Sequence, residues 1–479
     1  MLFNSIDFAI FLPVVFILYW FATKENLKQQ NVLLLISSYF FYGCWNWHFL
    51  LLLIFSTSLD YYTGIKMYET ENQRIKKFWF WFSICVNLGF LGVFKYYNFF
   101  VSSFADGLTL LGLNVNIWTL KVILPVGISF YTFHGLSYVI DIYKNRIKPE
   151  RNIISYSVFV CFFPLLVAGP IERATHLLPQ ILKKREFDYN KAVDGLRQIL
   201  WGFFKKIVIA DNCATYVNQI FDSYQTQSGS TLLVGGIFFA FQIYGDFSGY
   251  SDIAIGTAKL FGIDLLRNFA YPYFSRDIAE FWRRWHVSLT TWFRDYLYIP
   301  LGGSRGSKSQ VVRNTFIIFL VSGFWHGANW TFIVWGAFHA LLFLPLILLK
   351  KNRKNTNFVA EGRALPSFKE LFQMILTFLL VVIAWIFFRS NNIGIAFDYI
   401  GRLFNKSLLK NPTYLVGMGK TIFSLSILII IEWFQRNKKH GLELSFINNH
   451  LLKWTIYYAL IAIILEFGAN SQSFIYFQF

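Results

Sequence analysis

Residues 314–349 read NTFIIFLVSGFWHGANWTFIVWGAFHALLFLPLILL. This run is apolar over most of its length, and its only ionisable side chains are His326 and His339. Small and polar residues in its middle divide it into two apolar arms that can form helices. The run therefore predicts a helical hairpin in a membrane. A histidine inside such a hairpin requires a physical explanation.

The composition of the whole chain also indicates a membrane protein. Of its 479 residues, 55% are hydrophobic and only 15% are charged, whereas a soluble domain carries roughly 25% charged residues. Apolar runs alternate with short basic loops, and because cytoplasmic loops collect Lys and Arg, this sorting explains the net charge of +18 without a nucleic-acid partner. We therefore predict an all-α, polytopic protein in the lipid bilayer, with about 11 to 12 spans. The absence of repeats and linkers predicts one domain, residues 1–479.

Two segments do not fit simple spans. Residues 153–171 are apolar but have basic clusters on both sides, so we expect them to enter the membrane and return to the same side. Residues 281–300 carry too much charge to span, yet their large apolar residues recur at helical spacing. That pattern predicts an interfacial helix with one aromatic face and with arginines elsewhere on its surface. The predicted face comprises Phe281, Trp285, Leu289, Trp292 and Tyr296.

Polar side chains at membrane depth are candidate functional residues, because burying them in lipid is costly. His326 lies about twelve residues beyond Asn314, on the order of 18 Å from the cytoplasmic end of its span. An imidazole can take a proton from a hydroxyl and pass it on, so His326 is a candidate general base. A packing histidine that bonds a neighbouring helix explains the residue equally well from the sequence alone. Trp325 and Asn329 are placed to shape or polarise a pocket around it.

The other ionisable residues have structural explanations that compete with functional ones. His286 is explained by a surface position on the interfacial helix, and we expect His339 to be structural. Asp246 and Asp252 would bind an ion or orient a histidine, but pairing with the arginines of residues 281–294 is the simplest account. No two histidines have HxxxH spacing, so the local pattern predicts no metal site.

Several motifs together resemble the membrane-bound O-acyltransferase family, and specifically its bacterial branch of alginate and peptidoglycan O-acetyltransferases. The stretches that carry the resemblance are ILPVGISFYTFHGLSYVIDIY (123–143), FPLLVAGPIER (163–173), YGDFSGYSDIAIG (244–256), NFAYPYFSRDIAEFWRRWHVSLTTWFRDYLYIPLGGSR (268–305) and SGFWHGANWTFIVWGAFH (322–339). They follow the family's order over about half of the chain. The related teichoic-acid D-alanyl transfer branch shares the WRRWHVSL-type helix, but YIPLGGSR is similar to the acetyltransferases.

The resemblance implies a funnel-shaped helical fold in which His326 is the catalytic histidine and His286 a second important one. His134 departs from the family pattern, where a glutamine is expected. The implied reaction moves an acetyl group across the bacterial cytoplasmic membrane for O-acetylation of a cell-envelope or exported polysaccharide. A secreted or membrane-anchored partner protein is implied as the route to the polymer.

The implied donor is acetyl-CoA, used as a substrate without a bound cofactor, with its phosphates on cytoplasmic arginines. The candidate substrate-binding residues are Arg283, Arg284, Arg305, Trp285, Trp325, Asn329 and Asp246. One alternative is an acyl carrier protein as donor, which would dock on residues 281–305. Another is a transporter that uses mid-membrane polar residues as a relay, although no inverted repeat in the sequence favours it.

Overall fold

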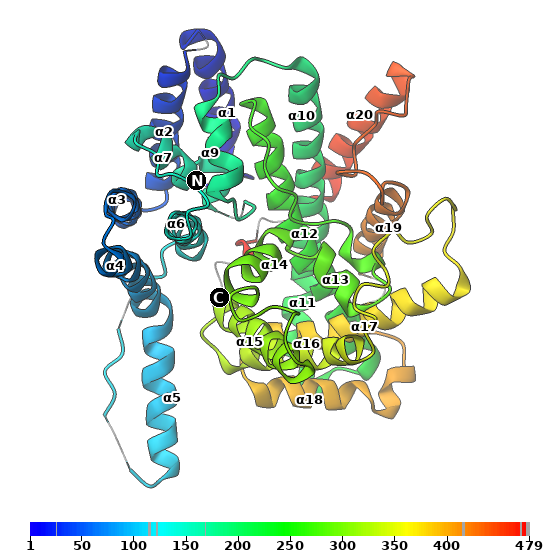
Figure 1. The fold of residues 1–479 in the computed structure, drawn as a ribbon. Helices are drawn as coiled ribbons and strands as arrows, with labels where there is room; N and C mark the ends of the chain where they lie inside the picture. The colour runs from blue at the N-terminus through cyan, green and yellow to red at the C-terminus, as the bar shows by residue number, and fades with distance from the viewer. Residues whose placement is uncertain are drawn as a thin grey trace. The chain divides into compact units, whose positions relative to one another are not determined.

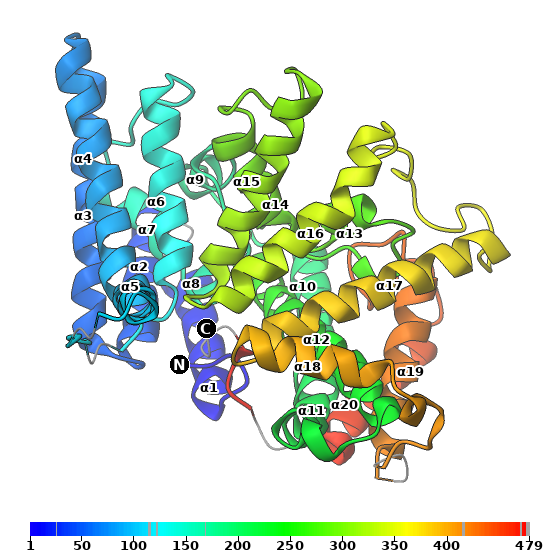
Figure 2. The ribbon, with the colours of Figure 1, turned by 90° about the horizontal axis from the view of Figure 1, so that it is seen from below.

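The computed structural model describes residues 1–24, 26–113, 116–120, 123–167, 169–413, 417–469 and 472–475 (Figures 1 and 2). Within these residues all regular structure is helical, which confirms the predicted all-α class. Five of the described helical segments are long and apolar enough to cross a membrane: Gln73–Leu110, Gly229–Leu260, Trp330–Leu348, Phe368–Arg389 and His450–Phe467. The total number of spans stays a prediction.

The helices form two compact units. Unit 1 comprises Met1–Ala192 and Thr257–Leu266, and unit 2 comprises Val193–Gly256 and Arg267–Phe479. Helix α12 (Gly229–Leu260) belongs mainly to unit 2, and its last turn belongs to unit 1. The single domain expected from the sequence stays a prediction.

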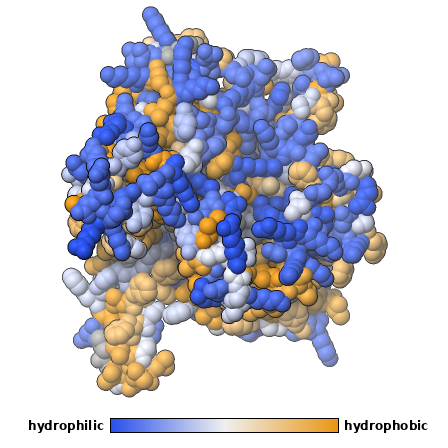
Figure 3. Space-filling model, in the orientation of Figure 1, coloured by the Kyte–Doolittle hydropathy of each residue, from blue (hydrophilic) through white to orange (hydrophobic). Residues whose placement is uncertain are grey.

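The first unit contains nine α-helices, two π-helical turns and the start of α10 (Tyr189–Phe203). These elements are α1 (Ile6–Ile17), η1 (Leu18–Ala22), α2 (Leu27–Gly43), α3 (Trp47–Glu69), α4 (Gln73–Leu91), η2 (Gly92–Tyr96), α5 (Tyr97–Leu110), α6 (Ile128–Tyr143), α7 (Ile153–Cys161), α8 (Phe163–Leu166) and α9 (Ala174–Leu182). Helix α5 appears as a hydrophobic region at the lower left of Figure 3, where Phe104 and Leu110 are 68% and 89% exposed. Such a surface fits contact with lipid.

A buried carboxylate fixes how α3, α4 and α6 pack (Figure 2). Asp60 of α3 accepts hydrogen bonds from Ser83 Oγ and Asn87 Nδ2 of α4 at 2.5 and 2.8 Å. Gly135 of α6 lies so close to the Asp60 carboxylate that a Cβ there would collide with it. Because a buried carboxylate is tolerated only when it is hydrogen-bonded, these contacts specify the alignment of the three helices.

The described part of residues 153–171 contains two short helices, and the re-entrant path expected for this segment stays a prediction. Helix α7 has nine residues and is followed by the four-residue α8 after a break at Phe162. Nine residues rise only about 14 Å, less than half of a hydrocarbon core of about 30 Å. The segment therefore does not span as one helix.

His134, whose role the sequence left open, bonds α6 to this segment. The backbone N–H of Glu172 donates to His134 Nε2 at 3.1 Å, and His134 Nδ1 lies 3.5 Å from the carbonyl oxygen of Val160. The Glu172 carboxylate in turn accepts from the backbone N–H of Leu266 at 2.6 Å and pairs with His176 Nδ1 at 2.8 Å. Both nitrogens of His134 are thus used within unit 1, which favours a structural role.

The ion pair between His176 and Glu172 predicts a pH dependence of stability. Its hydrogen bond to the Glu172 carboxylate raises the pKa of His176 above the ordinary value of 6.5. The stabilisation is therefore complete below about pH 6.5 and is lost as the pH rises through the raised folded-state pKa. We expect the Tm of the wild type minus that of His176→Gln to decrease from pH 6 to pH 9, measured by thermal unfolding in detergent. A difference that stays constant over this range would exclude the contribution.

The second unit contains the remainder of α10, most of α12 and all later elements. Its other elements are η3 (Phe204–Ala210), α11 (Asp211–Asp222), η4 (Tyr224–Thr226), η5 (Pro272–Phe274), α13 (Ile278–Arg284), α14 (Val287–Phe293), η6 (Arg294–Tyr298), α15 (Lys308–His326), α16 (Trp330–Leu348), α17 (Phe368–Arg389), α18 (Ile393–Leu403), η7 (Lys406–Leu409), α19 (Gly419–Phe434) and α20 (His450–Phe467). Helices α15 and α16 lie side by side (Figure 2) and form the predicted hairpin. Their backbones approach closely because side chains on Gly323 or Gly336 would collide with carbonyls of the opposite helix.

The carboxylates of α12 pair with lysines. Lys205 Nζ lies 2.5 Å from Asp252, and Lys206 Nζ lies 2.8 Å from both Asp211 and Asp246. Asp246 also accepts from the backbone N–H of Ile475 at 2.6 Å. The expected pairing of Asp246 and Asp252 with arginines is therefore wrong, because the π-helical turn η3 lies against α12 and supplies the cations.

Candidate active site

Residues 281–300 do not form the single helix that the sequence predicted. Helix α13 ends at Arg284, α14 begins at Val287, and η6 follows α14. Between α13 and α14, His286 has a φ of 43° and a ψ of 53°, a left-handed conformation that residues with a Cβ seldom adopt. His286 is also fully buried, so the expected surface position is wrong. The local break turns its side chain into the protein.

The predicted aromatic face of this segment is nevertheless buried, with Tyr296 alone half-buried. Trp285 stacks on Phe281 at a centroid distance of 5.5 Å and contacts Trp385 of α17 at 5.0 Å. These ring contacts assign Trp285 to the packing around the site. They also show that α17 supplies part of its wall.

Asn268 holds His286 in one tautomer. His286 Nδ1 lies 2.9 Å from Asn268 Oδ1, which also accepts from Ser288 Oγ at 2.9 Å. Asn268 Nδ2 donates to Ser251 Oγ at 3.1 Å, so its amide oxygen is the atom that faces the ring. Nδ1 therefore carries the proton and Nε2 keeps its lone pair, and among the described residues Nε2 has no hydrogen-bond partner. Burial lowers the pKa of His286 to about 3, so its ring is neutral.

His326 is the last residue of α15, at the turn of the hairpin. It is 3% exposed, and its ring centroid lies 6.5 Å from that of His286. Trp335 and Phe388 contact its ring edge-on at 5.1 and 5.4 Å. The structure thus brings together the two histidines singled out from the sequence.

His339 lies in the same hairpin but has a different environment. The indole N–H of Trp282 donates to His339 Nδ1 at 3.3 Å, and the histidine ring is fully buried among Trp282, Trp335 and Phe319. These contacts fit the structural role expected for it.

A cavity of about 520 Å³ extends along α15 toward the histidines. It is lined by Ala279, Trp282, Arg283, Val287, Leu289, Thr290, Thr291, Phe293, Arg294, Tyr298, Ser304, Thr315, Ile318, Phe319, Ser322, Phe343, Asn352 and Arg353. Val287 directly follows His286, and Ser322 precedes His326 by one helical turn, about 6 Å along the axis. The cavity is therefore apolar along its length, has arginines at one end and approaches both histidines at the other.

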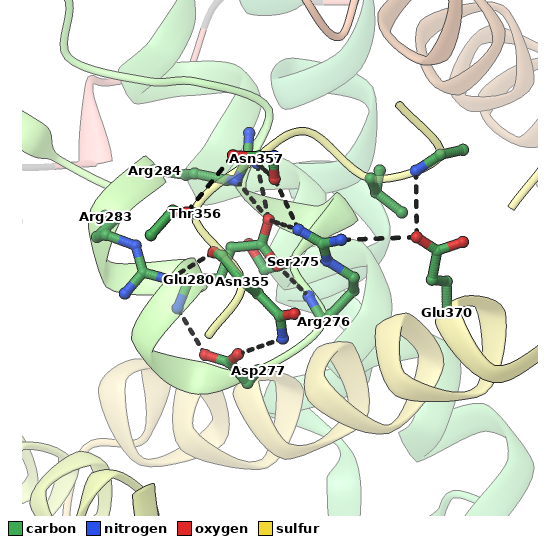
Figure 4. A network of polar contacts seen from close by, with 12 residues as sticks. Ser275, Arg276, Asp277, Glu280, Arg283, Arg284, Asn355, Thr356, Asn357 and Glu370 are labelled. Atoms are coloured by element: carbon green, nitrogen blue, oxygen red, sulfur yellow. Dashed lines mark hydrogen bonds and ion pairs between the residues drawn. The ribbon is translucent and has the colours of Figure 1, made fainter. Parts of the chain in front are cut away.

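The three candidate arginines occupy different places. Arg283 lines the cavity, but both of its terminal nitrogens donate to backbone carbonyls, as Figure 4 shows in part. Arg284 forms an ion pair with Glu280 at 2.7 Å. Arg305 is exposed, and its neighbour Ser304 lines the cavity instead. Among the arginines that line the cavity, Arg294 and Arg353 had not been singled out, since sequence alone does not show which loops meet.

The remaining candidates have defined contacts. Trp325 packs edge-on against His326 at 4.9 Å. The side chain of Asn329 accepts from the backbone N–H of Thr331 at 3.0 Å, which caps α16, and donates to the carbonyl of Asn391 at 2.9 Å. Asp246 belongs to the buried lysine cluster. No group of three or more potential metal-ligating side chains occurs in the described part of the chain.

Comparison with known proteins places this arrangement in a family. Residues 143–388, more than half of the chain, match the model of the membrane-bound O-acyltransferase family (MBOAT). The chain belongs to this family. The MBOAT region contains both His286 and His326 and ends at Phe388, which contacts the His326 ring.

Curated relatives agree with this assignment. The probable alginate O-acetylase AlgI of Pseudomonas syringae pv. tomato is 41% identical over 408 residues, covering 85% of this chain and 75% of its own length. The peptidoglycan O-acetyltransferase of Helicobacter pylori is 33% identical over 518 residues, covering 99% and 90%. A more distant relative, the teichoic acid D-alanyltransferase of Streptococcus thermophilus, is 32% identical over 239 residues, covering 45% and 55%.

Membership of the MBOAT family makes this chain an acyltransferase, and it sets aside the transporter alternative. Together with the five long apolar helices in the described residues, it also makes the chain a multi-pass membrane protein. Asn268 is the site residue that the sequence reasoning missed. It opens one of the family-like stretches, but its own side chain gave no signal that it would face a histidine 18 positions later.

Proposed function

We propose that this chain transfers an acetyl group from cytoplasmic acetyl-CoA to a hydroxyl presented from outside, for O-acetylation of a cell-envelope or exported polysaccharide. The proposed location is the bacterial cytoplasmic membrane, and a secreted or membrane-anchored partner protein would deliver the acetyl group to the polymer. The observation that carries the proposal is the approach of buried His286 and His326 at one end of a cavity with a basic mouth. The relatives named as an alginate O-acetylase and a peptidoglycan O-acetyltransferase support acetyl as the transferred group and a polysaccharide as the acceptor.

The cavity suits a thioester donor with a long arm. Its volume of about 520 Å³ is in the usual range for small-ligand sites. The apolar walls formed by Leu289, Phe319 and Phe343 would accept the pantetheine arm, while the arginines at the mouth would attract phosphates. The acetyl group would then lie beyond Ser322, beside His326.

In the proposed reaction His326 acts as the general base. Its ring takes the proton from the acceptor hydroxyl as the oxygen attacks the thioester carbonyl carbon. The carbon–sulfur bond then breaks, and the thiolate receives that proton from His326. The helix end at which His326 lies would stabilise the imidazolium between these two steps. Trp325 is the proposed donor to the oxyanion, because Asn329 is already occupied in capping α16.

His286 contributes a neutral ring in a fixed orientation. Since its Nδ1–H is held by Asn268, the Nε2 lone pair would accept a hydrogen bond from the acceptor hydroxyl and orient it toward His326. Asn268 is therefore a positioning residue, because it acts through the orientation of the His286 ring.

Replacing Asn268 by leucine is expected to lower kcat at least about tenfold, because His286 loses its tautomer and orientation. The KM for acetyl-CoA should stay unchanged, since Asn268 does not line the donor cavity. Asn268→Asp should restore part of the rate. It should also move the acid limb of the pH–rate profile to higher pH. The reason is that a carboxylate beside the His286 ring favours the protonated ring.

Ser288→Ala is the matched control for this prediction. It removes the second hydrogen bond to Asn268 Oδ1 without removing the one to His286, and the profile should be that of the wild type. If Asn268→Leu keeps the wild-type rate, His286 does not act in the way proposed.

The proposed function is tested with the purified full chain in nanodiscs. Labelled acetyl-CoA should be consumed with release of free thiol when a polysaccharide acceptor and its partner protein are added. In parallel, mass spectrometry should find that envelope or exported polymers from a deletion strain lack O-acetyl groups. Unchanged acetylation in that strain would contradict the proposal. Turnover with an acetyl-loaded carrier protein but not with acetyl-CoA would reassign the donor.

A further inference from the structure

Residues 350–366, which connect α16 to α17 without forming a helix, are held to α13 by arginine side chains (Figure 4). We call this segment the strap. The Arg283 guanidinium donates to the carbonyls of Asn352 and Asn355, each at 2.7 Å. Arg276 and Arg284 both donate to the carbonyl of Asn357, at 2.6 and 3.2 Å. Three arginines, two from α13 and Arg276 just before it, thus donate to backbone oxygens of the strap.

Further contacts fix the other parts of the strap. Asn355 Nδ2 donates to Asp277 Oδ2 at 2.6 Å. Near its far end, Arg436 donates to the carbonyls of Ala360 and Arg363 at 3.0 and 2.6 Å. Ordering a segment without regular structure costs conformational entropy, which these charge-assisted bonds offset. The strap is therefore held in one conformation from end to end.

The ordered strap places Arg353 at the mouth of the donor cavity. Asn352 and Arg353 are the two strap residues that line this cavity. The charge of Arg294, another lining residue, is balanced by Asp295 at 2.6 Å. Arg353 is exposed and makes no ion pair with any residue in the described ranges. Arg353 is consequently the strap's uncompensated cation at the mouth.

We propose that Arg353 binds a phosphate of a phosphopantetheine thioester and that Arg283 is the positioning residue that holds the strap for it. This inference rests on the proposed function and names the part of the donor that is recognised. A guanidinium matches a phosphate with two parallel hydrogen bonds, and the apolar cavity behind it accepts the arm that leads to the thioester. Phosphopantetheine occurs both in CoA and on carrier proteins, so the ligands tested must separate these sources.

The test measures binding to the purified full chain in nanodiscs by titration with CoA, 4′-phosphopantetheine and pantetheine. Arg353→Gln should weaken CoA binding by about tenfold or more, the usual effect of losing a hydrogen bond to a charged group, and should leave pantetheine binding unchanged. Lys354→Gln is the matched control, because it removes the same charge one residue away but lines a different cavity. It should bind all three ligands as the wild type does.

Each outcome bears on the proposal. Weaker binding of both CoA and phosphopantetheine assigns Arg353 to the phosphate next to the arm, which carrier proteins share, whereas weaker binding of CoA alone assigns it to the nucleotide phosphates. Either result supports anion recognition. Equal weakening of pantetheine binding, or equal effects of Arg353→Gln and Lys354→Gln, overturns it. If the wild type binds none of the ligands, the proposed donor itself is contradicted. If the wild type and Arg353→Gln bind CoA equally well, only the role of Arg353 is contradicted.

The positioning role of Arg283 has its own readout. Arg283→Lys keeps the charge but cannot bridge two carbonyls, so it should raise the KM for acetyl-CoA about as much as Arg353→Gln and leave kcat unchanged. The double variant should be no weaker than either single variant. Trypsin should also cleave the released strap faster, at Lys350–Lys354. Additive effects without faster cleavage would assign Arg283 to the donor directly and overturn the positioning role.

Discussion

Replacing His326 by alanine is expected to lower kcat for acetyl transfer by about 10²- to 10⁴-fold, the usual contribution of a general base. The ring lies at the end of α15, and its centroid is 6.5 Å from that of His286. Because His326 does not line the donor cavity, the affinity for CoA should stay near that of the wild type. The measurement is release of thiol from acetyl-CoA, with CoA binding measured in the same preparation.

His339→Gln is the matched control, since this histidine is buried in the same hairpin and accepts a hydrogen bond from Trp282. It should retain most of the activity, and the Tm of both variants shows whether each one folds. A folded His326→Ala protein that supports normal O-acetylation of envelope polysaccharide would reject the assignment of the base. Loss of CoA binding together with activity would instead indicate that the hairpin itself is disturbed.

Replacing Lys206 by methionine should destabilise the protein by about 3 to 5 kcal/mol, the cost of removing one partner of a buried ion pair. Lys206 is 1% exposed and is shared by Asp211 and Asp246, so its removal leaves two carboxylates buried without their cation. Chemical or thermal unfolding of the purified protein measures the loss. Adding Asp211→Asn and Asp246→Asn to the variant should recover part of it, because the uncompensated charges then disappear.

An exposed ion pair provides the comparison. Arg402 and Asp398 are 3.0 Å apart, and their side chains are 37% and 43% exposed. Asp398→Asn should therefore change the stability by at most about 1 kcal/mol. Equal losses for Lys206→Met and Asp398→Asn would mean that the lysine cluster contributes no more than a surface pair.

The sequence by itself determined the helical class and the hairpin of residues 314–349, and it singled out His326 as a candidate. Each follows from information that lies close together along the chain. An apolar run of sufficient length must satisfy its backbone hydrogen bonds within itself, so it becomes a helix. An imidazole inside such a run is conspicuous against its apolar neighbours. The motifs that resemble the family also point to His286 as a second important histidine.

Tertiary structure alone decided which side chains meet. The left-handed conformation of His286 interrupts a segment whose hydrophobic pattern predicts one helix. The pattern missed this break because it reports the spacing of apolar residues and not their backbone φ angles. Asn268 contacts His286 across 18 positions, and the carboxylates of α12 pair with lysines of η3 that lie 40 and 47 positions away, instead of the expected arginines. Arg283 looked like a phosphate ligand but is occupied by the strap, which places Arg353 at the cavity mouth. Such pairings depend on how helices pack in three dimensions, and local sequence patterns do not encode that packing.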